Sequence, residues 1–244
     1  MKILLIAGHG DGDPGALNKN MGYQEDLLAR EVVYGIATVL KDYCSVTIYD
    51  PEKNLYRELK AGRESKNLFK SFDYVLEVHF NAFNKSASGS ECLVKGEKGI
   101  TVEQGILESL ASLGFKNRGV KERTDLQNMN LCRSVGTSYC LLETCFIDSN
   151  SDLQLFLANR GRIPQIIAEA ILKGFGLKKE DSGVSISTPF KDVSEGDFGL
   201  QEIKLLKDLG IVQGHTDGTF KPDDMITRRE VAVLLGRLYR HLKS

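Results

Sequence analysis

Short apolar runs alternate with segments of helical periodicity through residue 175, and this alternation constrains the fold more than any other feature. Apolar runs bounded by polar turns indicate buried strands, whereas apolar residues every three or four positions indicate helices. The strand-like runs are 2–7, 45–49, 72–79, 90–94 and 138–146, and the helical segments are 25–41, 55–70, 101–113, 150–158 and 161–175. Such alternation predicts an α/β domain whose mostly parallel sheet is covered by helices on both faces.

The pattern stops at residue 177, which predicts a second, smaller unit after it. Residues 178–188 are polar, small and without periodicity, as in a linker. Helical spacing returns near 200–209 and 227–242 with a glycine-rich turn between them. We therefore expect a large domain at 1–177, a linker at 178–188 and a helical module at 189–244. So small a module buries little core, and we expect it to lean on a second copy or on the large domain.

Charge and hydropathy exclude several classes of protein. The 244 residues carry 32 Lys and Arg against 33 Asp and Glu, so neither nucleic acid nor an anionic membrane is the expected partner. The first apolar run, 2–7, is shorter than a secretory signal requires. We expect synthesis in the cytoplasm without a signal peptide, so that work outside the cell would need another route of release. Five cysteines without a CxxC pair argue against a disulfide framework or a cysteine zinc site.

Three side chains that can bind a metal ion or transfer a proton lie at or near the carboxyl ends of predicted strands. His9 follows the strand at 2–7, His79 ends the strand at 72–79, and Glu143 lies in or at the end of the strand at 138–146. Loops at that edge of a parallel sheet form the binding sites of α/β proteins. Two histidines at one sheet edge are as consistent with a site as with structural imidazoles, and both interpretations stay open at this point.

Glu25 opens the first predicted helix, where a carboxylate could simply cap the helix or favour its dipole. However, the loop between His9 and Glu25 can fold back over the sheet edge and bring Glu25 to the two histidines. Two histidines and one glutamate form the ligand set of a catalytic zinc ion that keeps an open position. Glu143 would then be available as the acid or base for attack of water on a carbonyl group.

A competing motif overlaps this loop, because Gly10 to Gly15 formally matches GxGxxG after a first strand. Asp11 and Asp13 would repel a pyrophosphate, and the helix starts too late to receive one. Asp50 ends the second strand, but its spacing does not fit that of a ribose-binding acid. Dinucleotide binding is therefore the weaker interpretation.

Four motifs in order resemble the type-3 N-acetylmuramoyl-L-alanine amidases over about residues 1–177. They are GHG at 8–10 with DPGA at 13–16, GYQE at 22–25, VHFNA at 78–82 and LLETCFIDS at 141–149. The resemblance implies a zinc hydrolase that cuts the amide between N-acetylmuramic acid and L-alanine of peptidoglycan. It implies that His9, Glu25 and His79 bind one Zn²⁺ and that Glu143 is the catalytic acid/base. Where the family often has serine, this chain has Glu77, which shares a strand face with His79 and is a candidate to support that ligand.

The carboxyl-terminal segment resembles one S-layer homology module. The resemblance is carried by FKDV at 190–193, IKLLKDLGIVQG at 203–214, DGTFKP at 217–222 and ITRRE at 226–230. It implies binding of a Gram-positive secondary cell-wall polysaccharide, with Asp192, Gly214, Thr227, Arg228 and Glu230 as candidate binding residues. Arg228 is the candidate for pairing with a carboxylate, or else it pairs locally. One module leaves open whether the chain forms a homo-oligomer through it or binds weakly as a single copy.

Together these resemblances predict a peptidoglycan amidase of the phage or prophage endolysin kind, released to the wall by a holin or by lysis. Its expected partners are peptidoglycan and the wall polysaccharide, with no role for nucleic acid or membrane. Two alternatives stay open: a zinc hydrolase of a different amide, and a wall-binding protein without catalysis.

Overall fold

The computed structural model describes residues 1–96, 101–178, 188–194, 197, 199–222 and 224–243. Two compact units make up the chain, Met1–Glu180 and Asp181–Ser244. Most of the segment expected to be a linker, residues 179–187, lies outside the described residues. No helix in the described part of the chain is both long and apolar enough to cross a membrane.

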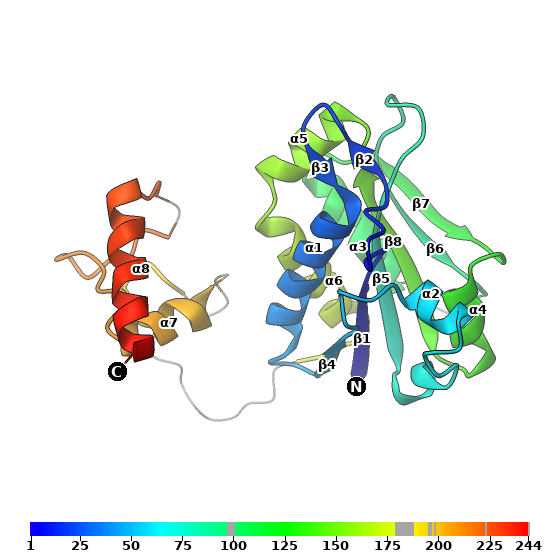
Figure 1. Cartoon of the computed structure of the whole chain (residues 1–244), viewed down its shortest axis with the longest axis horizontal. Coiled ribbons are helices and arrows are strands. Elements are labelled where there is room, and N and C mark those ends of the chain that lie inside the picture. Colours follow the sequence, from blue (N-terminus) through cyan, green and yellow to red (C-terminus); the bar gives the residue numbers. More distant parts are fainter. Residues whose placement is uncertain (97–100, 179–187, 195–196, 198, 223, 244) are drawn as a thin grey trace. The chain divides into compact units, whose positions relative to one another are not determined.

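A six-stranded sheet forms the centre of the first unit (Figure 1). Its strands, in spatial order, are β4 (Ser45–Ile48), β1 (Lys2–Ala7), β5 (Tyr74–Asn81), β8 (Ser138–Phe146), β6 (Ser90–Val94) and β7 (Asn117–Glu122). Neighbouring strands are parallel except for the antiparallel pair β6 and β8. The mostly parallel α/β sheet predicted from the sequence is confirmed.

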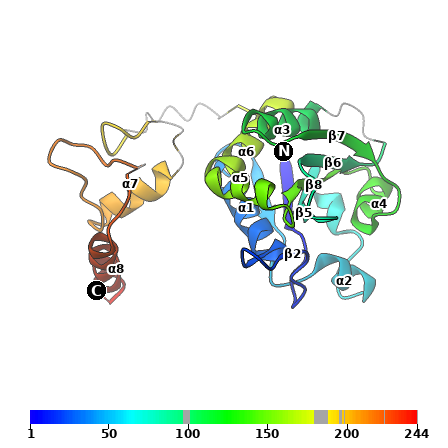
Figure 2. The same cartoon turned by 90° about the horizontal axis from the view of Figure 1, so that it is seen from above.

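Helices cover both faces of the sheet, as predicted (Figure 2). One face packs against α1 (Glu25–Leu40), α3 (Thr101–Ser112), α5 (Asn150–Ala158) and α6 (Arg162–Gly174). Among the described residues, the other face carries α2 (Leu55–Lys60), the short 3₁₀ helix at Leu68–Ser71 and α4 (Gln127–Ser134). Successive side chains of β1 point to opposite faces of the sheet. Ile3 and Leu5 therefore pack into the core on the first face, and Leu4 and Ile6 into the core on the second face. The thinner cover on the second face leaves room for a pocket there.

The helix predicted over 55–70 is wrong in its length, because α2 ends at Lys60. Gly62 adopts a left-handed conformation with φ of 69°. The backbone amides of Gly62 and Arg63 donate to the carbonyls of Leu59 and Glu58 at 3.2 and 2.9 Å. This pair of hydrogen bonds is a Schellman motif, which terminates a helix and turns the chain away.

Two elements between 117 and 134 were not predicted. The edge strand β7 has the sequence NRGVKE, which lacks an apolar alternation because it pairs on one side only. Helix α4 has a polar sequence, QNMNLCRS, of which only one side is buried. A two-stranded hairpin, β2 (Leu17–Asn18) and β3 (Tyr23–Gln24), also precedes α1. Each segment is too short or too polar for periodicity to reveal it.

The second unit contains α7 (Leu200–Asp208) and α8 (Arg228–Lys243), close to the two helices expected there. Its small core consists of Phe190, Val193, Leu200, Ile203 and Val212. None of the described residues of α8 is fully buried, so this helix lies on the outside of its own unit. The small core agrees with the limited burial expected for a module of this length.

Candidate metal centre and active site

His9 lies in a strained loop directly after β1. Its φ of 70° is unusual for a residue with a side chain, and such strain is concentrated at functional sites. Reciprocal backbone hydrogen bonds of 3.1 Å between Gly10 and Asp13 close the loop. The imidazole presents Nε2 to Glu25 Oε2 at 3.1 Å, while Nδ1 faces Asp13 Oδ2 at 3.3 Å. The loop thus aims one ring nitrogen at Glu25.

Glu25 is the first residue of α1, and its carboxylate is almost completely buried. The backbone amides of Ala16 and Phe80 donate to its two oxygens at 2.8 and 3.0 Å. The loop before α1 therefore folds back over the sheet edge, as expected from the sequence. Glu25 does more than favour the helix dipole, because both of its oxygens also face a histidine.

His79 lies inside β5, two residues before the end of the strand. Its Nδ1 atom is 2.9 Å from Glu25 Oε1, and its Nε2 atom is 3.1 Å from Glu77 Oε1. The rings of His79 and His9 meet edge to face with their centres 5.0 Å apart. Glu25 therefore stands between the two imidazoles.

These three residues form a set that could hold a metal ion, found among the described residues. One ligand atom from each lies within 4.8 Å of the other two. Ligands of a tetrahedral zinc are separated by about 3.3 Å, given Zn–N and Zn–O lengths near 2.0–2.1 Å, so small rotations would complete the site. Two imidazoles and one carboxylate are also the donor types that a catalytic zinc uses. The residues present therefore fit the ion that the family resemblance implies.

Charge coupling within the cluster shifts each pKa. Burial opposes the charged form of both histidines, but it is outweighed and both pKa values are raised. For His9 the cause is the hydrogen bond and the negative charge of Glu25. For His79 the cause is the hydrogen bonds to Glu25 and Glu77, with the negative charge of Glu77. Burial likewise opposes the charged form of Glu25 and so acts to raise its pKa, but the hydrogen bonds to both histidines outweigh burial and hold this pKa well below the usual range. The carboxylate is thus kept ionised, which is the form that binds a cation.

Two glycines allow the ligands to approach so closely. A Cβ atom on Gly8 would lie 2.3 Å from the His79 ring. A Cβ on Gly15 would lie 2.5 Å from Glu25 Oε2, and the φ of Gly15 is 64°. The motifs GHG and DPGA therefore contain glycine for steric reasons that concern the ligands directly.

Glu143 lies directly opposite His79 in the register of β5 and β8, so both side chains rise from the same face of the sheet. Its Oε2 atom is shielded from solvent and has no hydrogen-bond partner among the described residues. Burial, with the charges of Glu25 and Glu91, raises the pKa of Glu143 to about 7 although His79 acts to lower it. A carboxyl group in this state can accept and release a proton near neutral pH.

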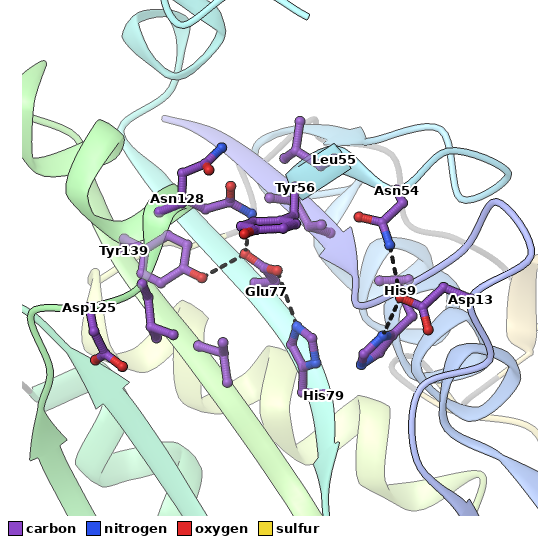
Figure 3. Close-up of a pocket in the computed structure, with 15 residues that line it drawn as sticks. His9, Asp13, Asn54, Leu55, Tyr56, Glu77, His79, Asp125, Asn128 and Tyr139 are labelled. Atoms are coloured by element: carbon purple, nitrogen blue, oxygen red, sulfur yellow. Dashed lines mark hydrogen bonds and ion pairs between the residues drawn. The ribbon is translucent and has the colours of Figure 1, made fainter. Parts of the chain in front are cut away.

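A pocket of about 250 Å³ opens beside the cluster, and Figure 3 shows its lining. His9, Asp13, Glu77 and His79 form one side of the lining, with Tyr139 and Leu141 of β8 on the same sheet face. The start of α2 and the loop into α4 supply Asn54 to Tyr56 and Asp125 to Asn128. Sequence reasoning missed these two segments because no motif marks them and α4 itself was not predicted.

The candidate residues of the second unit mostly have local partners. The backbone amides of Phe220 and Lys221 donate to Asp192 at 2.8 and 2.7 Å. The Thr227 amide donates to Glu230 at 2.8 Å and the Glu230 amide donates to Thr227 Oγ1 at 3.2 Å, which makes a capping box at the start of α8.

Two candidates remain in this unit, Gly214 and Arg228. A side chain on Gly214 would collide with Phe190 and the Thr219 carbonyl, so this glycine shapes the turn. Arg228 is exposed at the first position of α8. Of the five candidates, Arg228 is the one whose side chain is best placed to meet a ligand.

Comparisons with known proteins show the family of each unit. The family model of N-acetylmuramoyl-L-alanine amidase matches residues 3–175, and that of the S-layer homology domain matches residues 189–232. Probable autolysin PH of Staphylococcus aureus is 29% identical over 184 residues, which are 70% of this chain and 38% of that protein. This chain therefore corresponds to much less than the whole of that relative.

This chain covers a larger share of two further relatives. The sporulation-specific N-acetylmuramoyl-L-alanine amidase of Bacillus subtilis is 27% identical over 195 residues, 75% of this chain and 71% of that protein. A crystal structure of a presumed N-acetylmuramoyl-L-alanine amidase from Neisseria meningitidis is 30% identical with a TM-score of 0.61, covering 73% of this chain and 97% of that one. The chain thus belongs to the N-acetylmuramoyl-L-alanine amidase family and carries an S-layer homology domain after the amidase domain.

Proposed function

We propose that the first unit is a zinc-dependent amidase that cleaves the bond between N-acetylmuramic acid and L-alanine in peptidoglycan. The observation that carries this proposal is the convergence of His9, Glu25 and His79 on one point, with Glu143 opposite His79 at the same sheet edge. Membership of the amidase family supports the choice of bond. The adjoining pocket supplies space for a substrate next to the cluster.

In this proposal His9, Glu25 and His79 hold the ion, and Glu143 moves the proton. Bound Zn²⁺ polarises a carbonyl oxygen and makes water nucleophilic near neutral pH. Glu143 accepts a proton from water as the water oxygen bonds to the amide carbon. It then returns the proton to the alanine nitrogen as the C–N bond breaks, leaving a lactyl carboxylic acid and a free amine. Its unpartnered Oε2 retains the acceptor capacity that the first step needs.

Digestion of Gram-positive peptidoglycan by the full chain tests the activity. We expect new amino-terminal alanine and glycan without stem peptides, both identified by mass spectrometry, and loss of both products when a chelator removes the metal. Restoration by added Zn²⁺ would identify the ion. Cleavage of another amide would support the alternative hydrolase, and wall binding without any products would support the non-catalytic alternative.

We propose that the second unit binds a secondary cell-wall polysaccharide, with Arg228 pairing with an acidic group of that polymer. Support comes from the matched S-layer homology domain and from the exposure of Arg228. We expect Arg228→Ala to weaken co-sedimentation of the full chain with purified walls without lowering the melting temperature. Arg240→Ala, near the other end of α8, is the matched control and should sediment like the original chain. Equal sedimentation of both variants would contradict the role of Arg228.

We also propose that the protein acts as an endolysin, reaching the wall after a holin or lysis opens the membrane. Membership of the amidase family supports action of the protein on the cell wall. We expect cells that produce the protein to lyse only when the membrane is permeabilised from within. Lysis, or wall cleavage, without permeabilisation would contradict this route.

A further inference from the structure

Glu77 lies behind His79, on the side of the ring that faces away from Glu25. Its Oε1 atom is 3.1 Å from His79 Nε2. Its Oε2 atom accepts hydrogen bonds from the Tyr139 hydroxyl at 2.6 Å and from Asn128 Nδ2 at 2.9 Å. Figure 3 shows the three partners converging on this one carboxylate. The Glu77 side chain is only 10% exposed, so water contributes little to its solvation.

These hydrogen bonds determine which nitrogen of His79 carries the proton. An ionised carboxylate only accepts hydrogen bonds, so each of its neighbours must donate. Tyr139 and Asn128 both donate to its Oε2 atom, and hydrogen bonds of this kind favour the ionised form of a carboxyl group. Both ring nitrogens of His79 face a carboxylate, but only Glu25, on the Nδ1 side, belongs to the cluster that could hold an ion. An ion held there would take the place of the Nδ1 proton, and Nε2 would keep its hydrogen and donate it to Glu77.

His9 also has a carboxylate on the outer side of its ring, but this interaction is weaker than that between His79 and Glu77. Asp13 Oδ2 stands 3.3 Å from His9 Nδ1, on the side of the ring opposite Glu25. The side chain of Asp13 is 28% exposed, and its oxygens also meet Asn54 and Arg57, so its charge is shared and partly solvated. Glu77 is the more buried of the two supporting carboxylates, and its effect on the bound ion is expected to be the larger.

We propose that Glu77 is a positioning residue for the metal centre, which holds His79 in the Nδ1-binding tautomer and strengthens its bond to the ion. The inference rests on the zinc site of the proposed function and extends it to a residue that does not touch the ion. A carboxylate that accepts the outer N–H of a histidine ligand orients the ring and raises its basicity. Tyr139 and Asn128 extend the arrangement by fixing the carboxylate itself.

The test measures zinc affinity of the full chain by competition with a chromogenic chelator. We expect Glu77→Gln to weaken zinc binding by about 10–100-fold, since loss of such a supporting carboxylate has an effect of that size. Tyr139→Phe, which keeps the ring and removes one hydrogen bond to Glu77, should weaken binding by about tenfold, at the lower end of that range. It also keeps the proposal testable if Glu77→Gln does not fold.

Tyr74→Phe is the matched control. Tyr74 is also a buried tyrosine, and its hydroxyl donates to the buried Glu103 at 2.9 Å, but it belongs to the core on the other face of the sheet. Its loss should change thermal stability without changing zinc affinity. A second readout separates positioning from packing: the ring-nitrogen NMR signals of His79 in the zinc-loaded chain should show Nε2 protonated and Nδ1 bound. The absorption spectrum of the Co²⁺-substituted chain should change in Glu77→Gln and stay unchanged in Tyr74→Phe.

The outcomes are distinct. Weaker binding by Glu77→Gln or Tyr139→Phe, together with the Nε2-protonated signal, supports the proposal. Zinc affinity equal to that of the original chain in both folded variants, or a proton on Nδ1, overturns it while the proposed amidase activity stands. Failure of the original chain itself to bind zinc overturns both this inference and the zinc dependence of the proposed function.

Discussion

Replacement of Glu143 by Gln is expected to lower turnover of peptidoglycan by about 10²–10⁴-fold, the usual contribution of a general acid or base. The amide of Gln has nearly the shape of the carboxyl group but cannot take a proton from water or return one to the leaving nitrogen. Glu143 is not one of the three clustered ligands, so zinc content should stay at the level of the original chain. Initial rates of release of amino-terminal alanine, with metal analysis of the same sample, measure both effects.

The same variant should fold at least as stably as the original chain. Because burial raises the pKa of Glu143 to about 7, its ionisation opposes folding increasingly as the pH rises from the ordinary carboxyl pKa of 4.5 to about 7. A neutral Gln lacks that penalty, so the metal-free variant should gain stability relative to the original chain over this range. Equal turnover of the two folded, zinc-loaded proteins would remove Glu143 from the mechanism.

Gly8→Ala is expected to damage the metal centre without altering any ligand. The new methyl group would lie 2.3 Å from the ring of His79, which Glu25 and Glu77 hold from both sides. Overpacking of this kind costs about 1–3 kcal/mol of unfolding free energy. A ligand displaced by about 1 Å costs roughly 100-fold in rate, and we expect a loss of turnover of that order together with weaker zinc binding. Denaturant unfolding, chelator competition and product release measure the three effects.

Gly161→Ala provides the matched control. Gly161 precedes α6 with φ of −74°, and no atom lies within 4 Å of the place where its Cβ would be. This variant should keep the zinc affinity and turnover of the original chain. If Gly8→Ala bound zinc as tightly as Gly161→Ala, the close approach of Gly8 to His79 would have no functional role.

Much of the sheet could be predicted because its strands are buried on both faces and therefore read as continuous apolar runs. Strands β1, β6 and β8 match the predicted limits, whereas β5 begins and ends two residues later than the predicted 72–79. The edge strand β7 could not be predicted, since its pairing with β6 depends on backbone hydrogen bonds that any sequence can make. The left-handed Gly62 that follows α2 is a local signal for the end of the helix, which periodicity alone does not reveal.

The candidate site divides in a similar way. The carboxyl ends of β1, β5 and β8, with the motifs around them, predict that His9, Glu25, His79 and Glu143 lie together. For the interaction that supports His79, the sequence predicts only that Glu77 lies on the same face of the strand. Tyr139 and Asn128, which complete that support, come from positions 51 to 62 residues away in the chain.

The α/β class, the order of the two units and the candidate metal-binding residues can be read from the sequence, because they follow from local periodicity and from motifs. The folded structure is needed to show that Nδ1 of His79 and Nε2 of His9 face Glu25. It also shows that one oxygen of Glu143 has no hydrogen-bond partner among the described residues. Those features depend on the register of β5 against β8 and on the loop between His9 and Glu25. Distances of this kind arise from packing between distant segments, on which local residue preferences carry no information.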